Sequence, residues 1–119
     1  MTQNYVSTKI VLAWNQTHED GRRGYGVRYE DGYTSWSPKE AFEKCSIAIG
    51  HVDDKPPFLQ RMIGEFAQLV EKREKLKTFI EANHFKNLPI RKQRLLEQQL
   101  VYMEGYLAVL GSRIELEKQ

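Results

Sequence analysis

The sequence predicts an α+β protein, in which a small antiparallel β module with a short helix precedes a long antiparallel helical hairpin. Two observations carry this prediction. Aromatic and β-branched residues alternate with polar residues in the first third of the chain, between Gly-containing turns. From Phe58 onward, apolar residues recur at helical spacing, with one interruption near Pro89. We therefore place a β-rich domain at residues 1–52 and a hairpin for oligomerisation and ligand binding at residues 53–119.

Three strands are predicted in the β module. Residues 9–14 are mostly apolar, and residues 25–29 alternate apolar with polar side chains, as a half-buried strand does. Residues 33–36 form the third candidate and follow an Asp-Gly turn signal at Asp31. The pattern is typical of a small antiparallel sheet.

A short helix is predicted after the third strand, from Ser37 to about Lys44. Ser37 is a favourable N-cap residue, and Pro38 suits the first helical position. Because this cap would fix the corner between strand and helix, we expect Trp36 and Phe42 beside it to be structural residues.

The hairpin begins after a hinge that contains Asp53 and Asp54, either of which can cap a first helix over about residues 57–83. A turn is expected over about residues 83–89, where Asn and Pro disfavour helix. The second helix has an apolar seam with four-three spacing, as in an antiparallel coiled coil. Its members are Leu96, Leu100, Met103, Leu107, Leu110 and Ile114. Two helices that share one seam leave apolar surface uncovered, so we predict a homo-oligomer.

Composition limits the function classes. The chain has 40% hydrophobic and 29% charged residues, which fits a soluble cytosolic protein. A net charge of +2 is too small to argue for a nucleic-acid polymer as partner. No apolar run approaches the roughly 18 residues of a membrane span, so no membrane partner is expected. The single cysteine, Cys45, excludes an intrachain disulfide and suits a reducing compartment.

Catalysis is poorly supported by the residue pattern. The three histidines are scattered and lack ligands at metal spacing, and no glycine-rich phosphate loop stands between a strand and a helix. We therefore expect no catalytic residue, no metal and no cofactor. The sequence instead indicates a binding protein.

The strongest candidate site is the hairpin tip. Phe79 could stack on a base, Asn83 or Asn87 could bond a base edge or ribose, and Arg91 or Arg94 could meet phosphates. A helix start at the same place offers free N–H groups to anions. The alternative is that helix caps and a hydrophobic staple hold the tip, with no ligand.

Three further residues complete the candidate ligand contacts. Trp14 belongs either to a stacking surface or to the core of the small sheet. Met103 is part of the apolar seam. Arg113 either favours the negative C-terminal end of its helix or faces the pocket of a neighbouring subunit.

Two stretches resemble known phage modules. Residues 9–14 (KIVLAW) with residues 31–42 (DGYTSWSPKEAF) resemble a small β domain of bacteriophage proteins. Residues 57–63 (PFLQRMI), 75–80 (KLKTFI) and 94–107 (RLLEQQLVYMEGYL) resemble the helical hairpin of anti-CBASS and Thoeris anti-defence sponges. In this order they resemble the first Thoeris anti-defence family over nearly the whole chain.

The resemblance implies a non-enzymatic sponge in the cytoplasm of the infected bacterial host. Such proteins bind the cyclic ADP-ribose isomer made by bacterial TIR-domain enzymes, and family members also take up cyclic oligonucleotides of CBASS in a different pocket. The resemblance also implies a homo-oligomer, expected to be a hexamer. Two alternatives stay open at this point: a phage structural or regulatory module that binds only protein, and an enzyme that hydrolyses a cyclic nucleotide.

Overall fold

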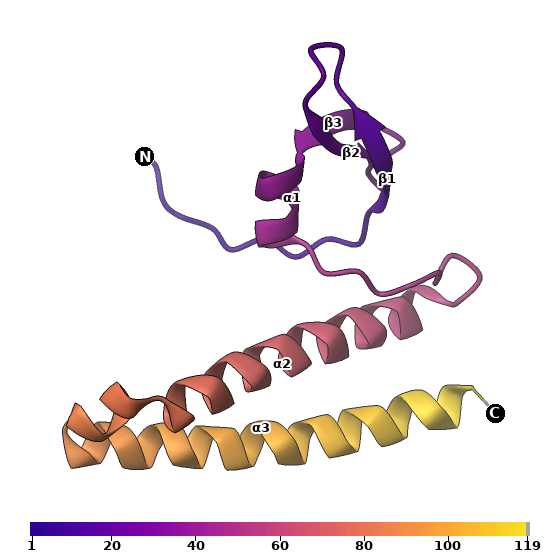
Figure 1. The fold of residues 1–119 in the computed structure, drawn as a ribbon. Helices are drawn as coiled ribbons and strands as arrows, with labels where there is room; N and C mark the ends of the chain where they lie inside the picture. The colour runs from indigo at the N-terminus through magenta and orange to yellow at the C-terminus, as the bar shows by residue number, and fades with distance from the viewer. Residues whose placement is uncertain (119) are drawn as a thin grey trace. The chain divides into compact units, whose positions relative to one another are not determined.

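The computed structural model describes residues 1–118 and confirms the α+β class (Figure 1). The chain forms two compact units, Met1–Ile47 and Ala48–Gln119. The first holds a three-stranded sheet and a short helix, and the second holds two long helices. The domain boundary after residue 52 that we drew from the sequence stays a prediction.

The first unit is built on an antiparallel sheet in the order β1-β2-β3. Its strands are β1 (Leu12–Thr17), β2 (Arg23–Arg28) and β3 (Thr34–Pro38). Glycines with positive φ make both connections: Gly21 has φ 90° and Gly32 has φ 88°. Gly32 closes its turn by donating its N–H to the carbonyl of Tyr29 at 2.9 Å. The Asp-Gly turn signal is thus confirmed.

One face of the sheet carries both tryptophans. Gly26 in the central strand pairs with Trp14 on one side and with Trp36 on the other. A Cβ built on Gly26 would collide with the indole of Trp14, and one on Gly24 would collide with the indole of Trp36. The two indoles therefore need glycine beneath them. Trp14 stays 41% exposed.

The opposite face packs on helix α1 (Lys39–Cys45). Phe42 of α1 stacks on Tyr25 of β2 with ring centroids 4.5 Å apart, and Val27 beside it is 2% exposed. The Tyr25 hydroxyl donates a hydrogen bond to Glu43 at 2.7 Å. These contacts between β2 and α1 form the small core of the unit.

The predicted strand over residues 9–14 is displaced in the structure, because β1 begins at Leu12 and continues to Thr17. Polar residues at the end of β1 resemble a loop in sequence. Every residue of this edge strand is exposed, so polar side chains cost nothing there.

The predicted cap at Ser37 is wrong. Ser37 is the penultimate residue of β3, α1 begins at Lys39 after Pro38, and no side chain caps it. The Ser37 hydroxyl instead lies 3.4 Å from the carbonyl oxygen of Pro38. The antiparallel pairing of Ser37 with Tyr25 explains the difference, because it extends the strand through the position of the cap.

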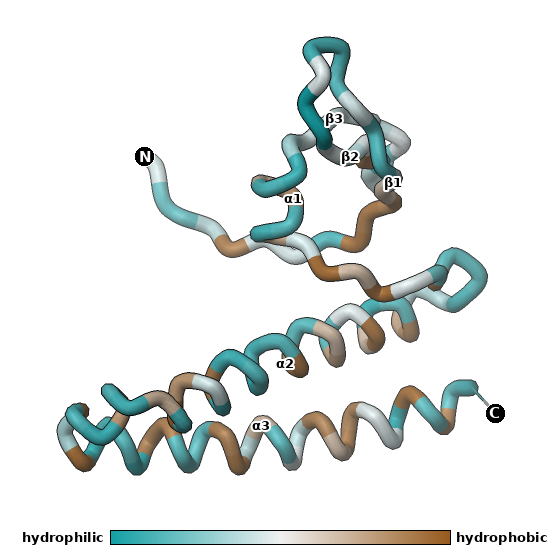
Figure 2. The backbone as a smooth tube through the Cα atoms, in the orientation of Figure 1, coloured by the Kyte–Doolittle hydropathy of each residue, from teal (hydrophilic) through white to brown (hydrophobic). Residues whose placement is uncertain are grey.

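The second unit is a hairpin of two long helices that lie side by side and antiparallel (Figure 1). Its elements are α2 (Pro57–Glu81), the 3-10 turn η1 (Asn83–Asn87) and α3 (Ile90–Glu117). Hydrophobic and hydrophilic positions alternate along both helices (Figure 2). The turn, predicted over residues 83–89, is confirmed.

The predicted seam of α3 faces α2. Leu107, Leu110 and Ile114 are buried, and the other seam positions are half-buried. The main core cluster joins Leu110 and Ile114 to Leu59 and Met62 of α2, with Ile63 and Phe66 packed against it. The seam is thus confirmed as the contact between the helices.

The predicted caps of α2 are wrong. Asp53 and Asp54 do not cap the helix, because Pro56 occupies the N-cap position and no side chain bonds the first turn. The cap position is set by the two prolines at 56 and 57, which start the helix later than the acidic pair. Helix α2 also ends at Glu81, two residues before the predicted end, and the 3-10 turn begins at Asn83.

Candidate functional site

The hairpin tip is organised around three aromatic rings. Phe79, in the last turn of α2, meets the ring of His84 at 5.0 Å and the ring of Phe85 at 6.0 Å, both edge to face. Phe85 is 4% exposed, whereas Phe79 is half-buried. The tip is therefore a packed structure with a partly open aromatic ring at its surface.

Gln93 fixes the tip onto α3. Its side-chain amide donates to the carbonyl of Leu88 at 2.8 Å and to that of Lys86 at 3.1 Å. These bonds satisfy carbonyls that a 3-10 turn leaves open. Our sequence reasoning missed this residue, since no local pattern tells which carbonyls a helical glutamine reaches.

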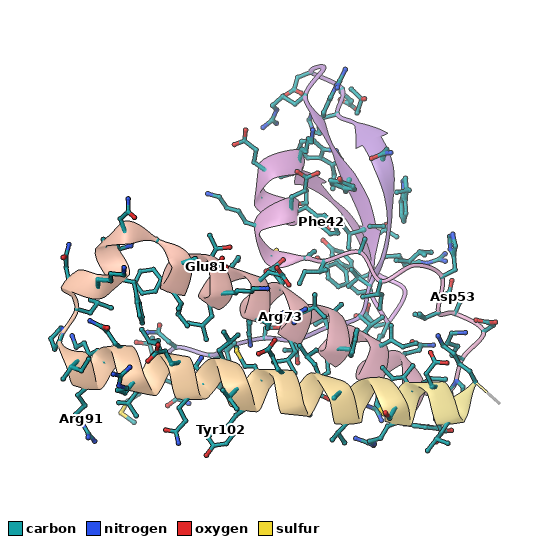
Figure 3. The ribbon with its side chains drawn as sticks, turned by 60° about the horizontal axis from the view of Figure 1, so that its bottom comes forward. Phe42, Asp53, Arg73, Glu81, Arg91 and Tyr102 are labelled. Atoms are coloured by element: carbon teal, nitrogen blue, oxygen red, sulfur yellow. The ribbon has the colours of Figure 1, made fainter. Side chains whose placement is uncertain are left out.

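The candidate polar residues lie around this tip. Asn83 and Asn87 bound η1, and both are exposed. Arg91 and Arg94 are exposed in the first turns of α3, three positions apart and so on neighbouring faces. Arg94 pairs with Glu97 at 2.9 Å. Within residues 1–118, Arg91 has no ion-pair partner, and Figure 3 shows it pointing away from α2.

The start of α3 also carries positive potential. No side chain caps it, and the N–H groups of Lys92 and Gln93 both bond the carbonyl of Pro89. The unpaired N–H groups of a first helical turn attract anions. Arg91 lies in that first turn, so the two positive features coincide.

The other three candidates lie elsewhere. Met103 is half-buried on the seam of α3, and Trp14 belongs to the first unit. Arg113 is exposed near the other end of α3, about 33 Å along the helix from Arg91 at 1.5 Å per residue. Within one chain, the structure thus does not bring Arg113 to the tip. None of these placements tests ligand contact, and the site residues stay predictions.

The outer face of α3 bears a second apolar stripe that the sequence reasoning did not separate from the seam. Its exposed apolar members are Leu95, Tyr102, Tyr106, Val109 and Leu116. Part of it is hollowed, with a volume of about 340 Å³ lined by Leu95, Gln98, Gln99, Tyr102, Met103 and Tyr106. Tyr102 is 66% exposed and points away from α2 (Figure 3). Met103 is the one predicted ligand contact that borders this hollow.

Comparison with known families decides the identity of the hairpin. A family model described as Sequestin matches residues 56–116, which is 61 of the 119 residues. The chain belongs to the Sequestin family. The match covers α2, η1 and nearly all of α3, and it agrees with the resemblance of the hairpin to anti-defence sponges. The resemblance of the β module to a phage domain stays a prediction. No curated protein and no solved structure matches the chain.

The name Sequestin points to binding and sequestration rather than to catalysis. Within residues 1–118, no group of three or more His, Cys, Asp or Glu side chains is placed to hold a metal ion. None of the helices in the same range is both long and apolar enough to span a membrane. The hairpin that the Sequestin model matches has three notable features: a packed aromatic tip, a cationic start of α3 and an exposed apolar stripe on α3.

Proposed function

We propose that this protein binds and sequesters a cyclic nucleotide immune signal without cleaving it. The ligand class is a cyclic ADP-ribose isomer, with cyclic oligonucleotides of CBASS as a second class. The protein acts as a phage anti-defence sponge in the cytoplasm of the infected bacterial host. The observation that carries the proposal is the Sequestin match over the hairpin, the unit whose tip gathers an aromatic ring, amides and arginines.

The chemistry of the tip supports this ligand class. A base stacks on an aromatic face such as that of Phe79, worth about 1–3 kcal/mol per base. A pyrophosphate is met by arginine forks and by free N–H groups at a helix start, and Arg91 supplies both features. Sequestration needs no acid, base or nucleophile.

The outer stripe of α3 supports a paired assembly. Its central part is symmetric about Tyr102: Leu95 and Val109 lie seven residues away on either side, and Tyr106 is matched by Gln98 four residues away. Steps of four and seven residues return to nearly the same face of a helix. Two antiparallel copies of α3 that cross at Tyr102 would therefore match Leu95 with Val109 of the other copy at both ends. Such self-complementarity is what a two-fold interface requires.

The same pairing would complete the tip. Arg91 and Arg113 each lie eleven residues from Tyr102, so Arg113 of one copy comes beside Arg91 of the other. Two arginines side by side repel each other unless an anion lies between them. A ligand pyrophosphate would be that anion. This relation gives Arg113 a role at the tip that one chain cannot give it, and further interfaces would extend the dimer to the expected hexamer.

The proposal is tested by offering the purified protein the mixed products of a TIR-domain enzyme and of a CBASS cyclase. After gel filtration, the bound small molecules are released by heat and identified by mass spectrometry. We expect an intact cyclic ADP-ribose isomer to co-purify. Recovery of only linear ADP-ribose would indicate a hydrolase. Recovery of no nucleotide would favour the module that binds only protein.

A further inference from the structure

The first unit contains a polar pocket of about 340 Å³, where the end of β1 meets the start of β2. It is lined by Asn15, Gln16, Thr17, Arg23, Gly24, Tyr25 and Lys39. None of the lining residues is acidic, and two carry a positive charge. The pocket belongs to the β module and shares no residue with the hairpin.

The sheet register explains why these side chains converge. Asn15 pairs with Tyr25 and Thr17 pairs with Arg23 across β1 and β2. Paired residues in adjacent strands project from the same face, and alternate residues of one strand do so too. The four side chains therefore stand together on the face that packs on α1. Lys39, the first residue of α1, closes the group.

The two cations in the pocket are not neutralised by the protein. Within residues 1–118, neither Arg23 nor Lys39 takes part in an ion pair, although eight such pairs exist there. Two carboxylates of the same unit have hydrogen-bond partners of their own: Asp20 accepts from Arg22 at 2.7 Å, and Glu43 accepts from the Tyr25 hydroxyl. An arginine and a lysine left together without counter-charge attract an anion.

Some neutral residues that line the pocket already form hydrogen bonds within the protein, and others do not. Gln16 is occupied, because its side-chain oxygen accepts the Trp14 indole N–H at 2.8 Å and its carbonyl accepts that of Trp36. Among residues 1–118, the side chains of Asn15 and Thr17 form no hydrogen bond within the protein. An amide and a hydroxyl thus stand free beside the two cations.

We propose that this pocket binds the phosphate group of a small phosphorylated molecule. Arg23 supplies a two-pronged donor that fits two phosphate oxygens, and Lys39 supplies a compact charge for the third. Thr17 and Asn15 donate to the same group or to its ester oxygen. The volume admits a phosphate and a small body attached to it. The site goes beyond the proposed sequestration by the hairpin and does not depend on it.

The test is a phosphate titration of the full-length protein, followed by two-dimensional NMR at constant ionic strength. Chloride serves as the reference salt. We expect inorganic phosphate to shift the resonances of Asn15 and Thr17 but not those of Lys72 and Lys77, two exposed lysines of α2 that lie outside both proposed sites. Adenosine monophosphate and ribose 5-phosphate form further arms, with adenosine and ribose as their phosphate-free counterparts. These arms distinguish a free phosphate site from one that prefers an esterified phosphate.

Two variants and two matched controls decide the assignment. Arg23→Gln and Lys39→Gln should each weaken phosphate binding about tenfold, as expected for loss of a charged hydrogen-bond donor. Arg28→Gln on the same strand and Lys44→Gln on the same helix lie outside the pocket and should leave affinity within a factor of two. Equal affinities in all four variants, or shifts spread over the whole charged surface, would overturn the proposal. Binding of single-stranded oligonucleotides without any response to the small phosphates would overturn it too.

Discussion

Phe79 and Phe85 meet edge to face at the hairpin tip, with ring centroids 6.0 Å apart and planes at 86° to each other. The contact joins the end of α2 to the 3-10 turn, two segments that must be held together for the chain to reverse. Phe85 is almost wholly enclosed, whereas Phe79 keeps part of its surface open. The pair therefore links the stability of the tip to the surface on which we place the ligand.

Replacing Phe79 with Ala should weaken ligand binding by about 1–3 kcal/mol, a five- to hundred-fold loss, because a stacking face is removed. It should also lower the free energy of unfolding, since the contact with Phe85 is lost. Calorimetry is therefore done below the melting temperature of the variant. Phe79→Leu is the companion variant: it keeps apolar volume and should recover stability more than affinity. Unchanged affinity in a folded Phe79→Ala protein would make Phe79 a core residue only.

Arg91 should matter for binding and not for folding. Arg91→Gln removes an exposed cation without an ion-pair partner among residues 1–118, so the melting temperature should stay nearly constant. Loss of a charged hydrogen bond to phosphate should cost about 1.5–3 kcal/mol of affinity. The neighbouring Lys92→Gln is the matched control. If both variants lost affinity equally, a general charge effect would replace a specific contact.

The symmetric stripe on α3 predicts the register of a dimer. Val109→Glu should dissociate the assembly, because Val109 is 60% exposed in one chain and would face Leu95 of the other. Ala108→Glu, about 100° around the helix, should leave the assembly intact. Light scattering at micromolar concentration measures the molar mass of both variants.

A double variant tests the same register further. Leu95→Lys combined with Val109→Glu places opposite charges together at both ends of the interface, so association should be stronger than for Val109→Glu alone. A wild-type protein that scattered light as a 14.0 kDa monomer would contradict the oligomer itself.

The pKa of Tyr25 should depend on the contact between β2 and α1. Its hydrogen bond to Glu43, with some burial, raises the pKa of Tyr25 above the ordinary tyrosine value. Because the bond needs the proton, its stabilisation is fully present below the ordinary pKa and is lost as the pH rises through the raised one. In an NMR titration, Glu43→Gln should lower the pKa of Tyr25, while Glu40→Gln on the same helix should not. An unchanged pKa of Tyr25 in the Glu43→Gln variant would refute the hydrogen bond between Tyr25 and Glu43.

The hairpin was predictable because apolar residues recur at helical spacing many times along it. The four-three spacing from Leu96 to Ile114 names the face of α3 that contacts α2, and prolines and asparagines mark the turn. The helix starts were not predictable in the same way. Ser37 and Asp53 are favourable caps by residue type, yet strand pairing and the proline pair move each helix start past them.

The candidate site was predictable only in its residue types. Aromatic, amide and arginine residues cluster near the tip in sequence, and the turn keeps them near one another. Gln93 lies beyond such reasoning, because its partners are carbonyls placed by the 3-10 turn. The stripe around Tyr102 was visible in the sequence, but it separates from the seam only when the buried face of α3 is known.

We propose that this member of the Sequestin family holds a cyclic nucleotide signal intact. The most direct test titrates the protein with a purified cyclic ADP-ribose isomer by calorimetry and then denatures the complex by heat. We expect binding with Kd near the nanomolar range, about 12 kcal/mol, and full recovery of the intact cyclic molecule. Absence of binding to cyclic ADP-ribose isomers and to CBASS cyclic oligonucleotides, or recovery of a cleaved product, would contradict the account.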